Sequence, residues 1–556
     1  MSGTDKIRSI KSEVRNNTIP ALFFALFFGY VLILFVYNMF CIRQGTDYLS
    51  VVTIWAGCGR YLFVILLLYG FLKKEDDYTF WTAAVGTGYI LQLLLSFLFC
   101  LRFTSASFML FTDLAAYFFI YVVCPAVTAW LIGRVCRSIK QDMLSVAAVL
   151  ILGSVFLFNV VQEILLFPVF QFSERVYTIF CKAFMIFNQS LKETFVKPNT
   201  FAPFAVNLTD VATAAFWIGF FALILGVIRK KKRMSVLVVL VLCCAILMTF
   251  DENKYQVYMS RSCLRNESKM IDSWNGDQKY YQEKKIILKN HKPVRAESDF
   301  LIEEYHLEIT PGLKTKFQAV LRLSQADISE YVFSLYHGYK VTSVTDYDGS
   351  TLAFTQQDDI VTVSADGKPL QEIMMKYEGT GQMYMASAEY TCFPQYYVYY
   401  PVAGQYTLYD VLAMGYAQNM DFPETEFSIV VHADYEVYSN IPKTAHNTFE
   451  GRGTGVTLVG GRYLRACEEN GVSIVYSVLS TDESSARSQY QSMIQFYREN
   501  EVDFTDKAWF DCPYYDGHGV RYYVGDSYLF GSYKELMMNM PLTYGIPSSK
   551  ILQWIQ

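Results

Sequence analysis

The sequence predicts two parts: a membrane all-α bundle of about seven transmembrane helices, followed by an extracellular, mostly-β sandwich or saddle domain with a short mixed C-terminal segment. The 556-residue chain is 53% hydrophobic with a mean hydropathy of +0.20, which is unusually apolar for a soluble protein. Long apolar runs lie before residue 250 and short alternating runs after it. The charges divide there too: residues 1–250 hold 21 Lys and Arg against 12 Asp and Glu, and residues 251–556 hold 26 against 40. This distribution contains no sustained basic stripe and excludes a nucleic-acid partner.

Seven segments are long and apolar enough to be predicted as membrane spans. A helix crossing the hydrocarbon core needs about 20 mostly apolar residues, because no water is available there to satisfy the backbone. The first segment is too long for a cleavable signal peptide, and six more follow it. The segments are 19–40, 49–72, 78–101, 107–132, 143–161, 208–228 and 234–250.

Clusters of Lys and Arg predict the orientation of these spans, since cationic loops stay on the cytoplasmic side. The clusters lie in four segments: 6–15, 73–74, 134–140 and 229–233. All four fall on one side if the chain crosses seven times, whereas the short loops on the other side carry only Arg43 and Arg102. We therefore expect a multi-pass plasma-membrane protein with a cytoplasmic N-terminus and an extracellular C-terminal domain.

Two charged residues within the predicted spans are candidates for a polar pair inside the membrane. Arg60 lies about midway along the second span, where its side chain cannot easily reach water, and Asp113 lies in the fourth. Charges in lipid are costly and often mark a pathway or a pairing. The alternative is that Asp113 lies near the outer end of its span.

The stretch 162–207, between the fifth and sixth spans, is external yet hydrophobic. Phe180, Phe184 and Phe187 follow near-helical spacing there, which predicts an interfacial or re-entrant helix; the alternative is a loop helix packed on the external domain. Six spans with this insertion resemble the permease subunits of type-2 ABC exporters. The resemblance implies a homodimer coupled to a separate cytoplasmic ATP-binding subunit, because the chain has no G-x-x-x-x-G-K-[ST] loop of its own.

After residue 250 the pattern changes to short runs in which apolar and polar residues alternate. Such period-two patterning predicts strands with one buried face, and the Asp348-Gly349 and Asp366-Gly367 pairs are typical of hairpin turns. The acidic pair Asp358-Asp359 is interpreted as solvated turn charges. The predicted strands are 301–310, 316–323, 331–336, 340–347, 360–364, 372–377, 427–432, 455–459 and 473–478.

Several of these segments, taken in order, carry a second resemblance. They are YHLEI (305–309), YKVTSVTDYDGSTL (339–352), IMMKYEGTG (373–381), CFPQYYVYYPVAG (392–404), FSIVVHADYEVYSN (427–440) and VGGRYLRA (459–466). Together they are similar to the N-terminal β-domain of the aminopeptidase N family of zinc peptidases. That family's reaction requires an H-E-x-x-H helix for zinc, and none of the six histidines here has the i, i+4 partner. We therefore predict no catalytic, metal-binding or cofactor-binding residue and no enzymatic activity.

A run of tyrosines forms the candidate ligand-facing group: Tyr396, Tyr397, Tyr399 and Tyr400. Phenol rings offer stacking area and a polar tip, which suits a peptide ligand. The alternative is packing against a neighbouring module. The external cysteines, Cys263, Cys392, Cys467 and Cys512, permit one disulfide whose pairing their spacing does not determine.

These observations give a domain plan and three functional hypotheses. The plan is a permease-like domain over 1–250, a linker over 251–299, an aminopeptidase-N-like β-domain over 300–480 and a mixed segment over 481–556. The leading hypothesis is an ABC-type exporter permease-like subunit with a noncatalytic β-domain for substrate or partner binding. The alternatives are a truncated or inactive membrane-anchored aminopeptidase-like protein and a membrane-tethered sensor.

Overall fold

The computed structural model describes residues 48–72, 79–100, 107–157, 183–187, 208–230 and 234–249, four positions between 277 and 284, residues 295–478 with short gaps, and residues 508–514 and 520–524, besides isolated positions elsewhere. The chain divides into two compact units. One is Met1–Phe195 with Phe204–Glu252, and the other is Val196–Pro203 with Asn253–Gln556.

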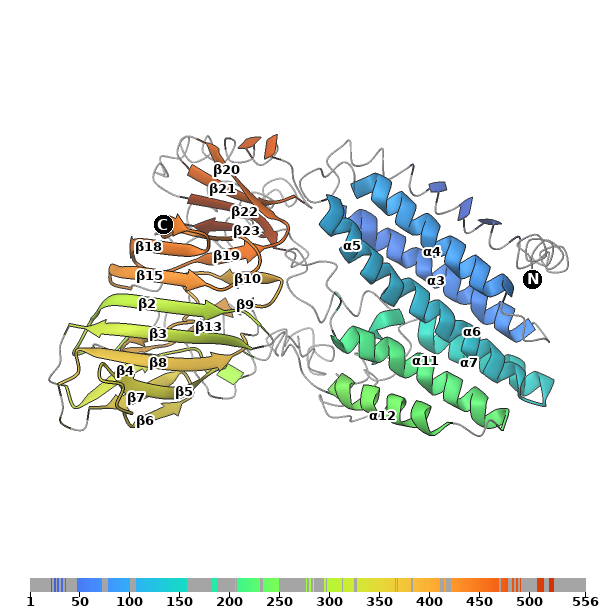
Figure 1. The fold of residues 1–556 in the computed structure, drawn as a ribbon, viewed down its shortest axis with the longest axis horizontal. Helices are drawn as coiled ribbons and strands as arrows, with labels where there is room; N and C mark the ends of the chain where they lie inside the picture. The colour runs from blue at the N-terminus through green and yellow to red at the C-terminus, as the bar shows by residue number, and fades with distance from the viewer. Residues whose placement is uncertain are drawn as a thin grey trace, which may run out of the picture. The chain divides into compact units, whose positions relative to one another are not determined.

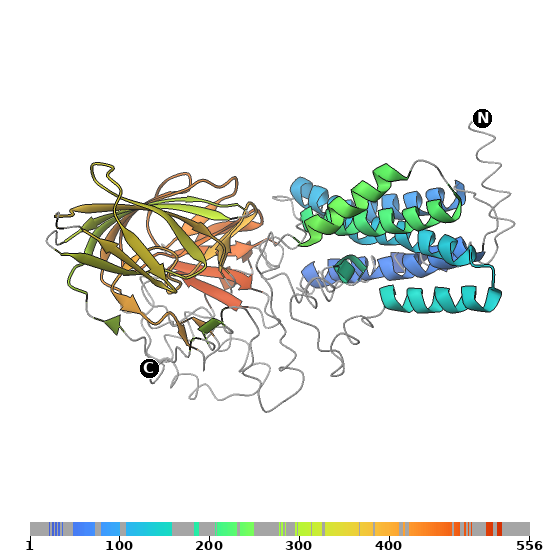
Figure 2. The same cartoon turned by 90° about the horizontal axis from the view of Figure 1, so that it is seen from below.

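The described part of the first unit is helical, and Figure 2 shows its helices running side by side. They form because the helix pairs its interior backbone N–H and C=O groups with each other, so that long runs of Leu, Val, Phe and Ala can be buried away from water. A π-helical turn, η1, precedes Pro125 and joins α5 and α6 into one continuous rod. The elements are α3 (Tyr48–Leu72), α4 (Thr79–Cys100), α5 (Ser107–Phe118), η1 (Phe119–Val123), α6 (Cys124–Arg137), α7 (Asp142–Leu157), η2 (Met185–Phe187), α11 (Leu208–Ile228) and α12 (Ser235–Thr249).

The prediction of seven transmembrane helices is wrong. Counting α5, η1 and α6 as one, the described residues contain six long helices. Where the side chains are described, two helical stretches, Phe108–Arg137 and Leu208–Ile228, are long and apolar enough to cross a membrane, by length and composition. The other apolar stretches with described side chains run 10–17 residues: Gly59–Leu72, Val85–Leu98, Asp142–Phe156 and Ser235–Leu247. Composition alone does not fix the number of spans, because an apolar run predicts a buried helix and a helix buried among other helices has the same composition as one buried in lipid. The first predicted span, 19–40, falls mostly outside the described residues.

The α3 and α6 helices pack at very close range through two glycines. A Cβ atom added to Gly70 would lie 2.5 Å from the carbonyl oxygen of Trp130, and one added to Gly133 would lie 2.8 Å from the backbone nitrogen of Phe71. Small residues at such a crossing let two helix backbones approach without intervening side chains. The crossing therefore depends on the absence of side chains at these two positions.

Most of the predicted interfacial helix lies outside the described residues, but its Phe184 and Phe187 are described. Both are buried in the helical unit, where Phe187 packs 4.6 Å from Phe156 between ring centroids. The Trp217 indole on α11 donates a hydrogen bond to the carbonyl oxygen of Ala183 (2.6 Å). This short piece is thus packed against α7 and α11.

The second unit contains the predicted large β-rich domain. Its main sheet has seven strands in the order β17-β18-β15-β2-β3-β8-β5, most of which are labelled side by side in Figure 1. Burial alternates along β2 and β3 as the sequence predicts, because successive side chains of a strand point to opposite faces. The strands are β2 (Ile302–Thr310), β3 (Thr315–Leu323), β5 (Tyr339–Asp346), β8 (Glu372–Gly379), β15 (Thr425–Val431), β17 (Lys443–Ala445) and β18 (Thr448–Gly453).

Smaller sheets complete this unit. One has the order β11-β4-β7-β6, another β16-β19-β10-β9, and a third β20-β21-β22-β23. The pairs β1-β12 and β13-β14 form two further sheets of two strands each. Their bounds are β1 (Arg295–Ala296), β4 (Glu330–Ser334), β6 (Phe354–Gln357), β7 (Ile360–Ser364), β9 (Met385–Ala386), β10 (Tyr390–Phe393), β11 (Val402–Ala403), β12 (Gln405–Tyr406), β13 (Tyr409–Asp410), β14 (Gly415–Tyr416), β16 (Val437–Ser439), β19 (Leu458–Gly461), β20 (Leu464–Glu469), β21 (Val472–Ser477), β22 (Ala508–Tyr514) and β23 (Val520–Val524).

Candidate functional site

The candidate site begins at the parallel pairing of β2 with β15. This register places Phe427 opposite Tyr305, and their rings stack with centroids 5.0 Å apart and an interplanar angle of 7°. Strand alternation turns both side chains to the buried face, where each is nearly inaccessible to solvent. The pair forms one wall of the site.

Tyr400 forms the second wall, on the segment that leads into β11. Its ring meets Tyr305 edge-on at 5.2 Å and Phe427 edge-on at 5.9 Å. The Tyr305 hydroxyl donates a hydrogen bond to the carbonyl oxygen of Pro401 (3.0 Å), which holds this segment against β2. Three aromatic rings from three separate segments are therefore fixed in one place.

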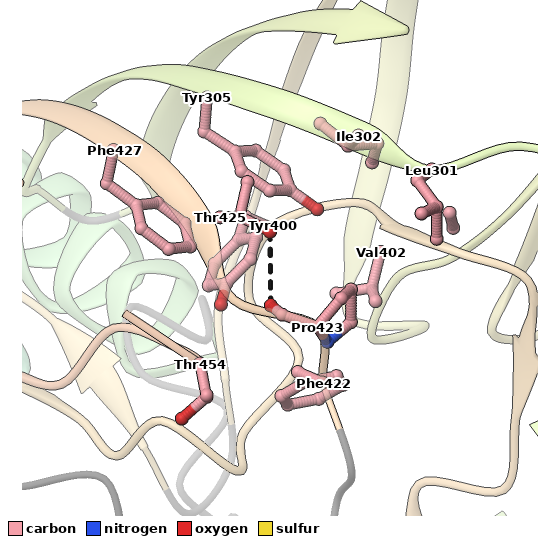
Figure 3. Close-up of a pocket in the computed structure, with 11 residues that line it drawn as sticks. Leu301, Ile302, Tyr305, Tyr400, Val402, Phe422, Pro423, Thr425, Phe427 and Thr454 are labelled. Carbon is pink, nitrogen blue, oxygen red and sulfur yellow. Dashed lines mark hydrogen bonds between the residues drawn. The ribbon is translucent and has the colours of Figure 1, made fainter. Parts of the chain in front are cut away.

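These rings border a small, partly open recess, drawn in Figure 3, whose enclosed part has room for about one or two water molecules. The enclosed space is far smaller than a small-molecule pocket, so a ligand group can contact the recess only at its open side. The Thr425 hydroxyl is satisfied locally by the carbonyl oxygen of Pro423 (3.1 Å), whereas the Thr454 hydroxyl has no hydrogen-bond partner among the described residues. The remaining lining residues are mostly apolar: Leu301, Ile302, Val402, Ala403 and Phe422.

The recess is electrically neutral over the physiological range. No Asp, Glu, Lys, Arg or His is among its described lining residues. Burial raises the pKa of Tyr305 well above its ordinary value and raises that of Tyr400 as well, because a phenolate would lose its hydration there. Both phenols therefore stay protonated, so this arrangement suits the binding of an apolar group and supplies no general base.

The structure places only one of the four predicted ligand-facing tyrosines at this recess. Tyr396, Tyr397 and Tyr399 lie in the core of the β-rich unit, so together with Tyr400 they form no exposed platform. These tyrosines can be buried because their hydroxyl groups form hydrogen bonds inside the core. Tyr399 donates to the carbonyl oxygen of Val456 (3.0 Å), and Tyr397 donates to the Tyr339 hydroxyl (3.3 Å). Of this tyrosine-rich run, only Tyr400 borders the recess.

The predicted intramembrane pair occupies two different helices. Arg60 lies on α3 with an exposed side chain, and Asp113 lies on α5 with a half-buried one. Their pairing stays a prediction. A carboxylate that the sequence pattern did not single out, Asp210 at the start of α11, is fully buried and interacts with Tyr121 of η1.

The described residues contain no group of three or more His, Cys, Asp or Glu placed to hold a metal ion. Of the external cysteines, Cys392 and Cys467 are buried and Cys263 lies outside the described residues. The pairing of these cysteines stays undetermined.

Comparisons with known proteins give only a partial likeness to solved structures. No family model matches the chain, and no curated protein matches it. Among solved structures, an M1 zinc metallopeptidase from Deinococcus radiodurans is similar at 15% identity and a TM-score of 0.24, covering 33% of this chain and 49% of that chain. Native yeast LTA4 hydrolase is similar at 9% identity and a TM-score of 0.28, covering 41% of this chain and 40% of that one. The chain thus spans half or less of these structures, and a likeness at this level says nothing about activity.

Proposed function

We propose that this chain is a membrane-anchored protein whose β-rich unit is a noncatalytic binding module. In this proposal the module faces the outside of the cell and holds one apolar side chain of an extended peptide or protein segment over the open side of the recess. The observation that carries the proposal is the neutral aromatic recess formed by Tyr305, Tyr400 and Phe427.

The chemistry of the recess favours a neutral, apolar side chain over a charged one. Removing a Leu or Phe side chain from water contributes about 1.5–3 kcal/mol, so one such contact supports a weak, reversible complex. A carboxylate entering the same space would lose its hydration without gaining a cationic partner among the described lining residues.

Binding of short peptides to the full chain in detergent tests this proposal. We expect a peptide with a central Phe or Leu to bind at least about tenfold more tightly than the same peptide with Asp, given the cost of desolvating a charge. The substitution Thr454→Phe should fill the mouth of the recess and reduce binding of the Phe peptide at least about tenfold. The matched control is Thr310→Phe, at an exposed position on β2, which should bind normally. Fluorescence polarisation with labelled peptides measures the binding of both peptides to the natural chain and to the two variants.

Other outcomes of the same experiment separate the parts of the proposal. Equal affinity for the Phe and Asp peptides would rule out the recess as the binding site. Binding by the purified chain but not by intact cells would place the module on the other side of the membrane. Release of amino acids from the bound peptide would replace the noncatalytic module with the aminopeptidase-like alternative.

The proposed function has a second part, which is a permease-like role of the helical unit. The fully buried Asp210 in an otherwise apolar helix supports it, since ionisable groups at such places often mark a transport pathway. We expect a separate ATP-binding subunit to co-purify with the full chain from its native membrane. Its consistent absence from gently solubilised preparations, with the β-rich unit intact, would leave the membrane-tethered sensor as the better description.

A further inference from the structure

A short segment between the helical unit and the first long strand is docked into the β-rich unit by charged and aromatic side chains. Its described residues are Asp277, Tyr280, Tyr281 and Lys284, which we call the strap. Their spacing of three and four residues places them on one face of a helical turn. Asp277 and Tyr281 are completely buried, although the sequence pattern predicts a linker in this region. The strap is thus part of the core of this unit.

The centre of the docking contact is His337, which lies between two buried carboxylates. Its Nδ1 atom is 3.1 Å from Oδ1 of Asp359, and its Nε2 atom is 3.5 Å from Oδ1 of Asp277. Asp359 also accepts a hydrogen bond from the His337 backbone N–H (2.8 Å), and Asp277 accepts one from the Tyr336 hydroxyl (2.6 Å). One imidazole therefore bridges a carboxylate of the strap and a carboxylate of the hairpin turn between β6 and β7.

The hairpin's other carboxylate also holds the strap. Asp358 accepts a hydrogen bond from the Tyr280 hydroxyl (2.5 Å) and pairs with Lys284 (2.9 Å). Hydrogen bonds from Tyr280 and then Lys284 lower the pKa of Asp358, so it stays ionised in the neutral range. The pair Asp358-Asp359 is therefore not a set of solvated turn charges, as the sequence pattern predicted, because Asp359 is buried against His337.

Aromatic rings cover the remaining faces of His337. Tyr280 stacks on the imidazole with centroids 3.7 Å apart, while Tyr281 and Tyr336 contact its other sides at 5.4 Å and 4.4 Å. Burial raises the pKa of Tyr280 and Tyr281, so both remain neutral phenols. The ionisable groups that face His337 are then the carboxylates of Asp277, Asp358 and Asp359, with Lys284 beyond Asp358 as the only cation of the strap among its described residues.

We propose that the strap is a detachable clasp whose docking is set by the protonation of His337. An imidazolium can donate to both Asp277 and Asp359 and offsets part of their negative charge, whereas a neutral imidazole has a single N–H and can donate to only one of them. Loss of the proton therefore leaves one buried carboxylate with fewer donors and increases repulsion within the cluster. The strap is therefore bound more firmly to the rest of the β-rich unit at mildly acidic pH than at alkaline pH.

Hydrogen exchange of the full chain in detergent, measured by mass spectrometry between pH 5.5 and 8.5, tests the clasp. Ordinary aspartates are ionised throughout this range, whereas histidine titrates within it. After correction for intrinsic exchange, we expect strap peptides to be protected about tenfold more at pH 5.5 than at pH 8.5, as the loss of a charge-assisted hydrogen bond implies. Peptides from β2 should show no such change.

The substitution His337→Gln should abolish the pH dependence of strap protection, because Gln does not titrate. The control His306→Gln, at an exposed position on β2, should retain it. If His337→Gln also exposes β2, Asp277→Asn replaces it as the test, since it removes one carboxylate and should reduce the pH dependence. Strap protection that is the same at both pH values in the natural chain, or a pH dependence that persists in a folded His337→Gln variant, would overturn the proposal.

Discussion

Replacing Gly133 by Ala should destabilise the helical unit by about 3 kcal/mol, the upper range for overpacking a tight interface. Even one methyl group at this position would overlap the backbone of α3 at Leu67 and would lie 2.8 Å from the Phe71 nitrogen. Backbone atoms cannot rotate away as side chains do, so α3 and α6 must separate. Thermal unfolding of the full chain in detergent, followed by helical circular dichroism, measures the effect.

Gly86 on α4 provides the matched control for Gly133. A Cβ atom added there would meet no heavy atom of another helix within 4 Å among the described residues. The substitution Gly86→Ala should leave stability unchanged or raise it by about 0.5–1 kcal/mol, because Ala loses less backbone entropy in a helix. Equal stability of the Gly133→Ala and Gly86→Ala variants would contradict the close α3–α6 crossing.

Replacing Phe393 by Ala should remove about 3–5 kcal/mol from the free energy of unfolding of the β-rich unit, as is typical for a buried Phe in a core that cannot collapse. Phe393 is fully buried, and its ring stacks on Tyr399 with centroids 4.5 Å apart. It also packs against Phe317 at 6.0 Å, so its removal leaves a cavity between β3 and the tyrosine segment. Such a loss is a large part of the stability of an ordinary domain.

The exposed Tyr347 is the control for Phe393, because 79% of its surface is accessible. Tyr347→Ala removes an aromatic ring of similar size and should change the free energy of unfolding by no more than about 0.5 kcal/mol. Urea unfolding of the full chain, followed through hydrogen exchange of β3 and β8 peptides, separates this unit from the helices. A Phe393→Ala variant as stable as Tyr347→Ala would show that the aromatic core is packed differently.

The sequence could predict strands because their signal is local. Side-chain alternation in β2, β3, β7 and β8 requires only a run of five to nine residues, and the predicted bounds lie within a few residues of the observed ones. The number of membrane spans could not be predicted securely, because hydropathy indicates that a helix is buried and does not distinguish burial in lipid from burial against other helices. Local pattern thus determined the kind of element more securely than its surroundings.

The candidate site and the clasp could not be predicted because both depend on pairings between distant segments. Tyr305 meets Phe427 only through the parallel register of β2 and β15, and strand pairing across such a separation leaves no signal in either strand. His337 likewise contacts Asp359, which lies 22 positions away in the chain, and Asp277, which lies farther away in a segment that the sequence pattern predicts to be a linker. The sequence by itself determined an apolar helical part, an acidic β-rich part and a tyrosine-rich run within the latter. Only the tertiary structure decided which ring faces the recess and which carboxylates share one histidine, because burial and charge proximity arise from packing rather than from chain order.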